Sequence, residues 1–190
     1  VMDALVQSDP GGAPLFAFIN DINSKLWALF GQINVDLTEN LELTGALRYD
    51  HDKQTFENRL SAGSYRDAKF DQLQPKIQLS YDWTENVMAY ATWSKGFRTG
   101  GFDQIQKFDN EVATNYEFGV KATALDGLLV INTSIFHIDY ANQQLSFVVL
   151  DPNDATNTLR GVLNIPATDI EGLELEVTAR PMDGLDVNLG

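Results

Sequence analysis

The residue types that most often perform chemistry are scarce in this chain, which has two histidines and no cysteine. One histidine, His51, stands between Asp50 and Asp52, and all three are common metal-ligand types. Neighbouring residues of a strand point to opposite faces, so these side chains would not converge on one ion. We therefore expect no metal site and no cofactor at this position.

The second histidine, His137, alternates with Ile138 and precedes Asp139 by two residues. We expect His137 to face the polar interior of the protein beside Asp139, where the two form a simple polar pair. The sequence has neither a Gly-x-Ser-x-Gly motif nor a phosphate-binding loop. With no nucleophile and base to name, it predicts no catalytic residues and a protein that is not an enzyme.

Composition excludes some partners. The formal net charge is −14 and only 13 residues are Lys or Arg, which argues against a nucleic-acid partner. No apolar run approaches the roughly 18 residues that a spanning helix requires. The chain opens without the segments of a signal peptide, and an alternating pattern that starts at Leu185 stops at Gly190. We therefore expect the sequence to be a fragment of a longer protein.

The elements that position these residues have the period-2 alternation of strands. From Trp27 to Leu37, apolar residues share one parity and polar residues the other, which predicts a strand with one apolar face. Repetition of this pattern predicts about eight strands in four hairpins, the last of them incomplete. The hairpins are joined by short turns at Thr38-Glu39-Asn40, Thr84-Glu85-Asn86, Asp126-Gly127 and Pro181-Met182-Asp183-Gly184.

The connections between hairpins are longer and polar, at residues 55–70, 98–111 and 150–159. Short turns and long loops therefore alternate, which puts every short turn at one end of the strands. That asymmetry is typical of outer-membrane barrels, in which the short turns are periplasmic and the long loops extracellular. Residues 1–24 contain Pro10-Gly11-Gly12 and predict an irregular lead-in or another extracellular loop.

Strand length favours a membrane barrel over a soluble β-sandwich. A strand from Trp27 to Leu37, tilted by about 40°, covers roughly 25 Å of the membrane normal. Aromatic residues are expected at two levels, near the short turns (Tyr81, Trp83) and at the far strand ends (Trp27, Tyr49, Tyr116, Tyr140). The strand at residues 87–97 leaves open which of its parities faces lipid.

Polar residues on the opposite parity are expected to face the barrel interior, because they carry too many charges for a dry core. These residues are Asp36, Glu42, Arg48, Gln74, Lys76, Gln78, Glu117, Lys121, Glu174 and Glu176.

Four stretches together resemble a known family, the TonB-dependent receptors of the bacterial outer membrane. They occur in the order and at the spacing of that family's barrel, and the resemblance covers residues 26–190. The stretches are Leu29-Phe30-Gly31-Gln32 leading to Leu47-Arg48-Tyr49-Asp50, Lys95-Gly96-Phe97-Arg98-Thr99-Gly100-Gly101-Phe102, Tyr116-Glu117-Phe118-Gly119-Val120-Lys121, and Ile170-Glu171-Gly172-Leu173-Glu174-Leu175-Glu176.

The resemblance implies an all-β, antiparallel, up-and-down transmembrane barrel of the 22-stranded type, of which residues 25–190 are one part. It further implies a Gram-negative outer-membrane location, contact with outer-membrane lipid, and energy-coupled uptake of a scarce nutrient such as a ferric siderophore. The TonB–ExbB–ExbD system would act through an N-terminal region. No plug, TonB box or terminal strand is found in the sequence, so these parts are expected to be missing from it.

Family motifs do not transfer ligand contacts, because loops differ among receptors. An anionic ligand such as a ferric siderophore would favour cations near the long loops, and this predicts Arg59, Arg66, Arg98 and Lys107 as ligand-binding candidates. Two other functions stay open at this point, a passive porin-like outer-membrane channel and a soluble β-sandwich binding module.

Overall fold

The computed structural model describes residues 2–8, 14–59, 64–152, 154–182 and 184–190. Strands account for most of this part of the chain, with one 3₁₀ turn, η1 (Leu125–Gly127). The strands are β1 (Met2–Ser8), β2 (Pro14–Thr38), β3 (Leu41–Asn58), β4 (Arg66–Thr84), β5 (Val87–Arg98), β6 (Gly101–Phe102), β7 (Lys107–Phe108), β8 (Glu111–Ala124), β9 (Leu129–Asp151), β10 (Asp154–Met182) and β11 (Leu185–Leu189).

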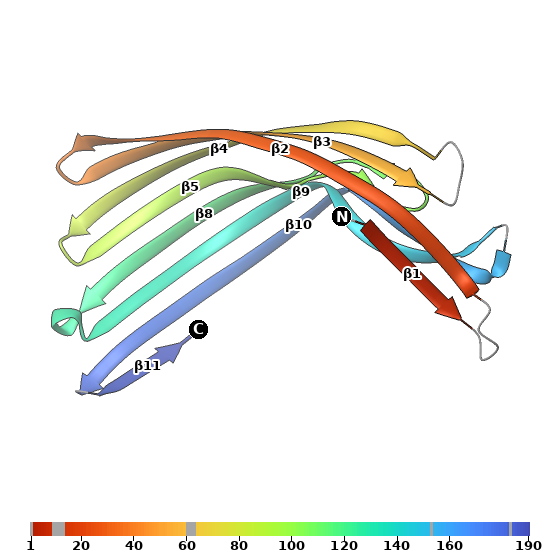
Figure 1. Cartoon of the computed structure of the whole chain (residues 1–190). Coiled ribbons are helices and arrows are strands. Elements are labelled where there is room, and N and C mark those ends of the chain that lie inside the picture. The colour runs from red at the N-terminus through yellow and green to blue at the C-terminus, as the bar shows by residue number, and fades with distance from the viewer. Residues whose placement is uncertain (1, 9–13, 60–63, 153, 183) are drawn as a thin grey trace.

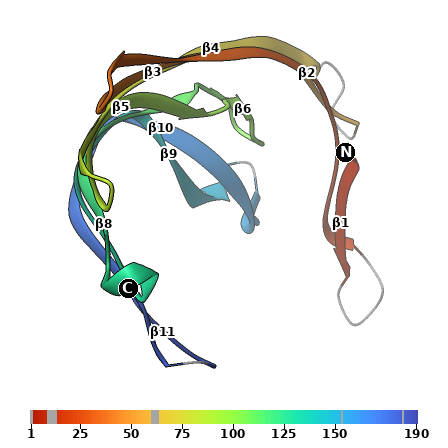
Figure 2. The same cartoon turned by 90° about the vertical axis from the view of Figure 1, so that its left-hand side faces the viewer.

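Nine of these strands form one antiparallel sheet in the order β1-β2-β3-β4-β5-β8-β9-β10-β11. Apart from the β6–β7 hairpin, each strand pairs with its neighbour in the sequence (Figure 1). The sheet bends into an open, curved wall with a concave side (Figure 2). The prediction of a partial up-and-down barrel with four hairpins is therefore confirmed.

The short turns lie together at one end of the wall, as predicted (Figure 1). The repeated tripeptide folds in the same way twice, because the Asn40 backbone N–H donates to Thr38 Oγ1 (3.3 Å) and that of Asn86 donates to Thr84 Oγ1 (3.2 Å). Each turn also accepts a bond from the next hairpin, Asp82 N to Asn40 O and Thr123 N to Asn86 O, both 2.8 Å. The repeat therefore joins neighbouring turns as well as closing each one.

The convex face is apolar and uncovered. The exposed fractions are 72% for Leu29 of β2, 50% for Phe118 of β8 and 71% for Leu173 of β10. Among the described residues, the only buried hydrophobic side chains are Phe56 and Phe70. A soluble sandwich would press its apolar faces together, whereas this sheet leaves them free to meet lipid.

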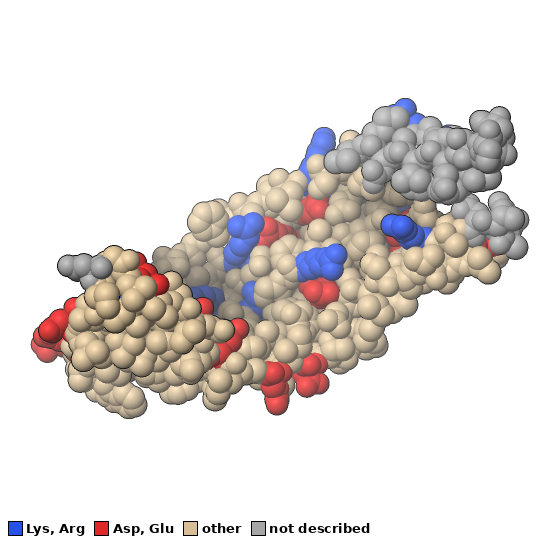
Figure 3. Space-filling model, turned by 90° about the horizontal axis from the view of Figure 1, so that it is seen from below, with Lys and Arg blue, Asp and Glu red and all other residues tan. Residues whose placement is uncertain are grey.

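The concave face, called the inner face below, is polar. Register places all ten residues that were predicted to line the interior on this one face. Figure 3 shows Lys and Arg interspersed with Asp and Glu in the hollow beneath the sheet. The strand whose orientation the sequence left open, β5, turns Tyr90 inward and Trp93 outward, since Tyr90 pairs with Ser80 and Trp93 with Ile77.

Two orientations on β9 were predicted wrongly. His137 is paired with outward-facing Tyr116, so His137 lies on the convex face, as does Asp139 two residues further. Tyr140 pairs with Ala113 and faces inward, so it is not one of the lipid-facing aromatic residues at the far strand ends. On β9 both the odd-numbered and the even-numbered positions carry apolar residues, so alternation alone does not show which set faces lipid. The pairing of β9 with β8 determines it.

The strands are longer than predicted. β1 and the start of β2 occupy the described residues 2–8 and 14–24, so this part of the segment is strand rather than irregular, and its assignment to an extracellular loop stays a prediction. β3, β4, β9 and β10 likewise extend into the connections at 55–70 and 150–159. The wall therefore continues as β-ribbon well past the apolar band on the side of the long loops.

Candidate functional site at the mouth of the barrel

Residues 99–110 fold back onto the inner face as a compact segment, called the inner hairpin below, at the end opposite the short turns. β6 pairs with β7 through Gly101–Phe108 and Phe102–Lys107. Asp103 Oδ1 accepts bonds from the backbone N–H groups of Ile105 (2.7 Å) and Gln106 (2.6 Å), which closes the tip. Figure 2 shows β6 on the concave side, so this connection is directed into the mouth.

One side of the inner hairpin packs on β3 and β4. Gln54 Nε2 donates to Gly100 O at 3.1 Å, and the rings of Phe56 and Phe102 are 6.1 Å apart. A Cβ on Gly100 would lie 2.4 Å from Cε1 of Phe70 and 2.5 Å from the Phe108 carbonyl oxygen. Only glycine allows this approach of the backbone to the wall.

The other side is bonded to β9 and β10. Gln144 Nε2 donates to Thr99 O at 2.9 Å and to Asp109 O at 3.1 Å. The Val162 backbone N–H donates to Asp103 Oδ2 at 2.5 Å, and the Asp109 N–H donates to Asn164 Oδ1 at 2.8 Å. The inner hairpin therefore bridges two parts of the wall that are 90 to 110 positions apart in the sequence, Gln54 on one side and Gln144 and Asn164 on the other.

Two of the four predicted ligand-binding cations contact this hairpin. The Arg66 guanidinium carbon lies 4.5 Å from the centroid of the Phe56 ring and 5.5 Å from that of Phe102. Arg66 Nη2 also donates to Asp103 O at 2.9 Å. Lys107 Nζ lies 5.3 Å from the Phe70 centroid and 2.9 Å from Asp109 Oδ1.

The other two cations lie apart from it. Arg98 is the last residue of β5 and pairs with Glu111 of β8. Its exposed side chain is on the inner face, next to the start of the inner hairpin. Arg59 forms an ion pair with Asp21 of β2, through a 2.6 Å bond from Nε to Oδ2. The structure therefore brings Arg66 and Lys107 together around the hairpin, places Arg98 beside it, and separates Arg59.

A chain of polar groups around two buried carboxylates, Asp50 and Asp52, lies on the inner face between the short turns and the inner hairpin. Arg48 donates twice to Asp50, at 2.7 and 2.6 Å, and Gln74 Nε2 donates to the same carboxylate at 2.6 Å. Asp52 then accepts from Ser24 Oγ (2.5 Å) and from Gln54 Nε2 (2.7 Å). Because both carboxylates are buried and bonded, they hold this stretch of wall rigid.

Phe56, Phe70 and Phe102 were not predicted as part of the site, since all three lie in the segments that were predicted as loops. The available signal was parity, because Phe56 and Phe70 continue the inner-face positions of β3 and β4 beyond the polar run. Rings, cations and backbone carbonyls together suit a planar, anionic or hydroxyl-rich ligand better than a bare ion. In the part of the chain that the structure describes, no group of three or more His, Asp or Glu could hold a metal.

Comparison with known proteins agrees with this architecture. The family profile described as TonB dependent receptor-like, beta-barrel matches residues 3–190. A curated relative, the metal-pseudopaline receptor CntO of Pseudomonas aeruginosa, is 34% identical over 122 residues, which is 60% of this chain and 17% of the receptor. Among the described residues, no helix is long and apolar enough to cross a membrane.

Solved structures show the same fold. The ferric yersiniabactin uptake receptor FyuA of Yersinia pestis superposes on 97% of this chain, with a TM-score of 0.77 and 19% identity. The matched part is 29% of the FyuA chain. The ferripyoverdine receptor of Pseudomonas aeruginosa matches 93% of this chain and 23% of its own, with a TM-score of 0.69 and 17% identity. The chain spans less than a third of the length of each of these relatives. Since the profile match runs over nearly the whole sequence, the chain belongs to the TonB-dependent receptor-like β-barrel family of the Gram-negative outer membrane.

Proposed function

We propose that the protein containing this chain is an outer-membrane receptor for TonB-dependent, energy-coupled uptake of a scarce nutrient, and that the nutrient is a metal–chelator complex of the ferric siderophore class. Family membership over residues 3–190 is the observation that carries the proposal. The relatives named above, receptors for metal-pseudopaline, ferric yersiniabactin and ferripyoverdine, support the ligand class.

The inner hairpin supports a receptor over a passive porin-like channel. It narrows the mouth and carries cationic and aromatic groups, with Arg66 and Lys107 each over a phenylalanine ring. We assign to Arg66, Lys107 and Arg98 the attraction of an anionic chelate, with Arg59 outside that set because its ion pair with Asp21 lies elsewhere. The rest of the receptor would supply a plug, and through it the contact with TonB–ExbB–ExbD.

We further propose that residues 25–190 act as barrel wall and mouth and perform no catalysis, since the site offers no nucleophile beside a base. The receptor needs no cofactor of its own in this scheme, and the metal enters as cargo within the chelate.

Uptake by the complete receptor tests the proposal. A deletion strain would be supplied with radiolabelled iron bound to catecholate, hydroxamate or carboxylate chelators, with and without a protonophore. We expect the receptor gene to restore uptake of at least one chelate, and the protonophore to abolish it. Uptake that persists without the proton gradient, or steady ion conductance of the purified receptor in a planar bilayer, would instead establish a passive channel.

A further inference from the structure

Three lysines form a continuous row across the convex face. Lys25 of β2 is paired directly with Lys53 of β3, and Lys53 with Lys69 of β4. All three side chains are exposed, and none of them forms an ion pair among the residues that the structure describes. Since neighbouring strands are about 4.8 Å apart, the row is about 10 Å wide.

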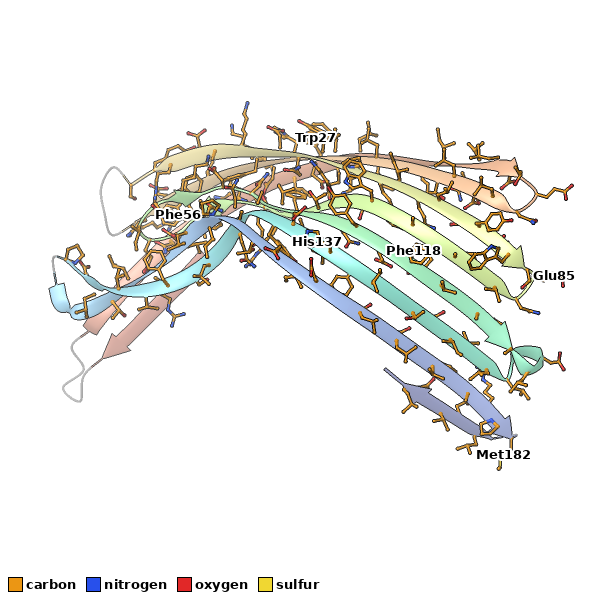
Figure 4. The ribbon with its side chains drawn as sticks, turned by 180° about the vertical axis from the view of Figure 1, so that it is seen from behind. Trp27, Phe56, Glu85, Phe118, His137 and Met182 are labelled. Atoms are coloured by element: carbon orange, nitrogen blue, oxygen red, sulfur yellow. The ribbon has the colours of Figure 1, made fainter. Side chains whose placement is uncertain are left out.

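The height of this row on the barrel follows from the rows beneath it. Two residues nearer the short turns, Trp27 pairs with His51 and His51 with Asp71, and their side chains form the aromatic boundary of the apolar band. Figure 4 shows Trp27 on the convex side of the sheet. Because the short turns are periplasmic, the lysine row lies just above the apolar band, at the headgroups of the outer leaflet.

Such a row is costly without an anionic partner, because like charges directly opposite each other on a sheet destabilise it. The chain has 27 acidic residues, yet none pairs across the strands with these three lysines. In the neighbouring row toward the short turns, the carboxylate of Asp71 already accepts bonds from Tyr49 and His51, at 2.6 Å each. On the other side, Asp67 lies on β4 two residues from Lys69 toward the long loops. It is on the strand of Lys69, so the charges of Lys25 and Lys53 have no carboxylate beside them.

We propose that the row of Lys25, Lys53 and Lys69 binds the phosphate groups of a phosphorylated lipid of the outer leaflet, whose acyl chains lie on the apolar face below. Lysine ammonium groups are strong point-charge partners for phosphate. Trp27 and the apolar residues nearer the short turns continue the lipid-facing surface without a break, so headgroup and chains are accommodated together. The site is independent of the ligand taken up through the mouth.

The other half of the wall provides the control. There the boundary row contains Tyr116 and His137, and the row beyond it contains Lys95, Thr114, Asp139 and Asp169 in register. That row has one cation and two carboxylates, so it lacks the concentrated positive charge. Lys95 is therefore a matched lysine on the same convex face that should not bind phosphate strongly.

The test uses the complete receptor in detergent, titrated with lipid A and with its dephosphorylated form, with binding followed by native mass spectrometry. Each Lys→Gln change in the row should weaken lipid A binding about five-fold, and the triple variant about a hundred-fold, from the contribution of a lysine near an anionic surface. The triple Lys→Arg variant should bind like the parent, as should Lys95→Gln. The parent should bind the dephosphorylated lipid as weakly as the triple Lys→Gln variant binds lipid A.

The proposal is overturned if the triple Lys→Gln variant retains the parent affinity, if Lys95→Gln loses as much, or if removing the phosphates has no effect. Heat-modifiable migration on gels confirms that each variant is a folded barrel. Chelate uptake, measured separately, reports on the proposed transport function and should not depend on these lysines in a strain that inserts the receptor normally.

Discussion

Replacing Gly100 with alanine should detach the inner hairpin from the wall of the mouth. The added Cβ would lie 2.4 Å from Cε1 of Phe70 and 2.5 Å from the carbonyl oxygen of Phe108. A rotation of the Phe70 ring relieves the first contact, but the second is with backbone, so β6 and β7 must shift. Overpacking of this kind costs about 1 to 3 kcal/mol, which lowers the docked population relative to the undocked one by about 5-fold to 150-fold.

Hydrogen exchange can follow this change at a distant position. Across the hairpin interface, the Val162 backbone N–H donates to Asp103 Oδ2 at 2.5 Å and the Asp109 backbone N–H donates to Asn164 Oδ1 at 2.8 Å. In the Gly100→Ala receptor we expect peptides containing these amides to exchange faster by the same factor, whereas amides that are hydrogen-bonded between neighbouring barrel strands keep their protection. Affinity for an anionic ferric chelate should fall in parallel.

Gly96→Ala is the matched control, because a Cβ on Gly96 of β5 would meet no atom within 4 Å. It should leave both exchange and affinity unchanged. Equal exchange in the parent and the Gly100→Ala receptor would refute the reasoning, since the close approach would then contribute nothing to holding the hairpin against the wall.

Three further predictions concern the cations, the lipid face and the turns. Arg66→Ala should loosen the inner hairpin by about 1 to 2 kcal/mol in hydrogen exchange, through the lost ring contacts and charged hydrogen bond, whereas Arg59→Ala should not change it. Leu175→Arg on the lipid face should destabilise the barrel by about 2 to 4 kcal/mol in refolding titrations into lipid vesicles, and a similar loss for inner-face Glu176→Arg would contradict the assignment of faces. Thr84→Ala removes the 3.2 Å bond to the Asn86 amide and should cost up to about 1 kcal/mol in the same titration, with the same change in the first copy of the turn giving a similar result.

Alternation was sufficient to predict much of the wall. On β8 it separated outward Tyr116 and Phe118 from inward Glu117, and the register confirms this. It could not orient β9, where Ile135 and Phe136 are both apolar, because such a pattern satisfies either face. Pairing of Phe136 with inward Glu117 resolves the orientation, and pairing is a property of two strands rather than of one.

The mouth was less predictable for a different reason. Charge and composition identified Arg66 and Lys107 as loop cations, but the contacts between the inner hairpin and the wall join residues that are 35 to 59 positions apart. A bond such as that from Val162 to Asp103 depends on the curvature of the whole sheet, which brings β10 opposite β3 and β4 across the mouth. No local pattern encodes that closure.

The two histidines occupy equivalent positions on the convex face of the barrel wall, each in a cross-strand row with an aromatic residue and a carboxylate. In register, Trp27, His51 and Asp71 form one cross-strand row, and Tyr116, His137 and Glu171 form another. In both rows the ring contacts an aromatic neighbour, at 5.5 Å for Trp27 and 6.3 Å for Tyr116, and a ring nitrogen meets a carboxylate, at 2.6 and 3.1 Å.

An imidazole held in this way has an apolar contact with an aromatic ring and a satisfied polar contact with a carboxylate, which suits the boundary between the lipid band and the headgroups. Asp50 and Asp52, next to His51 in the sequence, bond on the inner face instead. The triplet that resembled a metal site is therefore divided between the two sides of the wall. Its histidine belongs to the membrane boundary, and its carboxylates belong to the polar chain beneath the mouth.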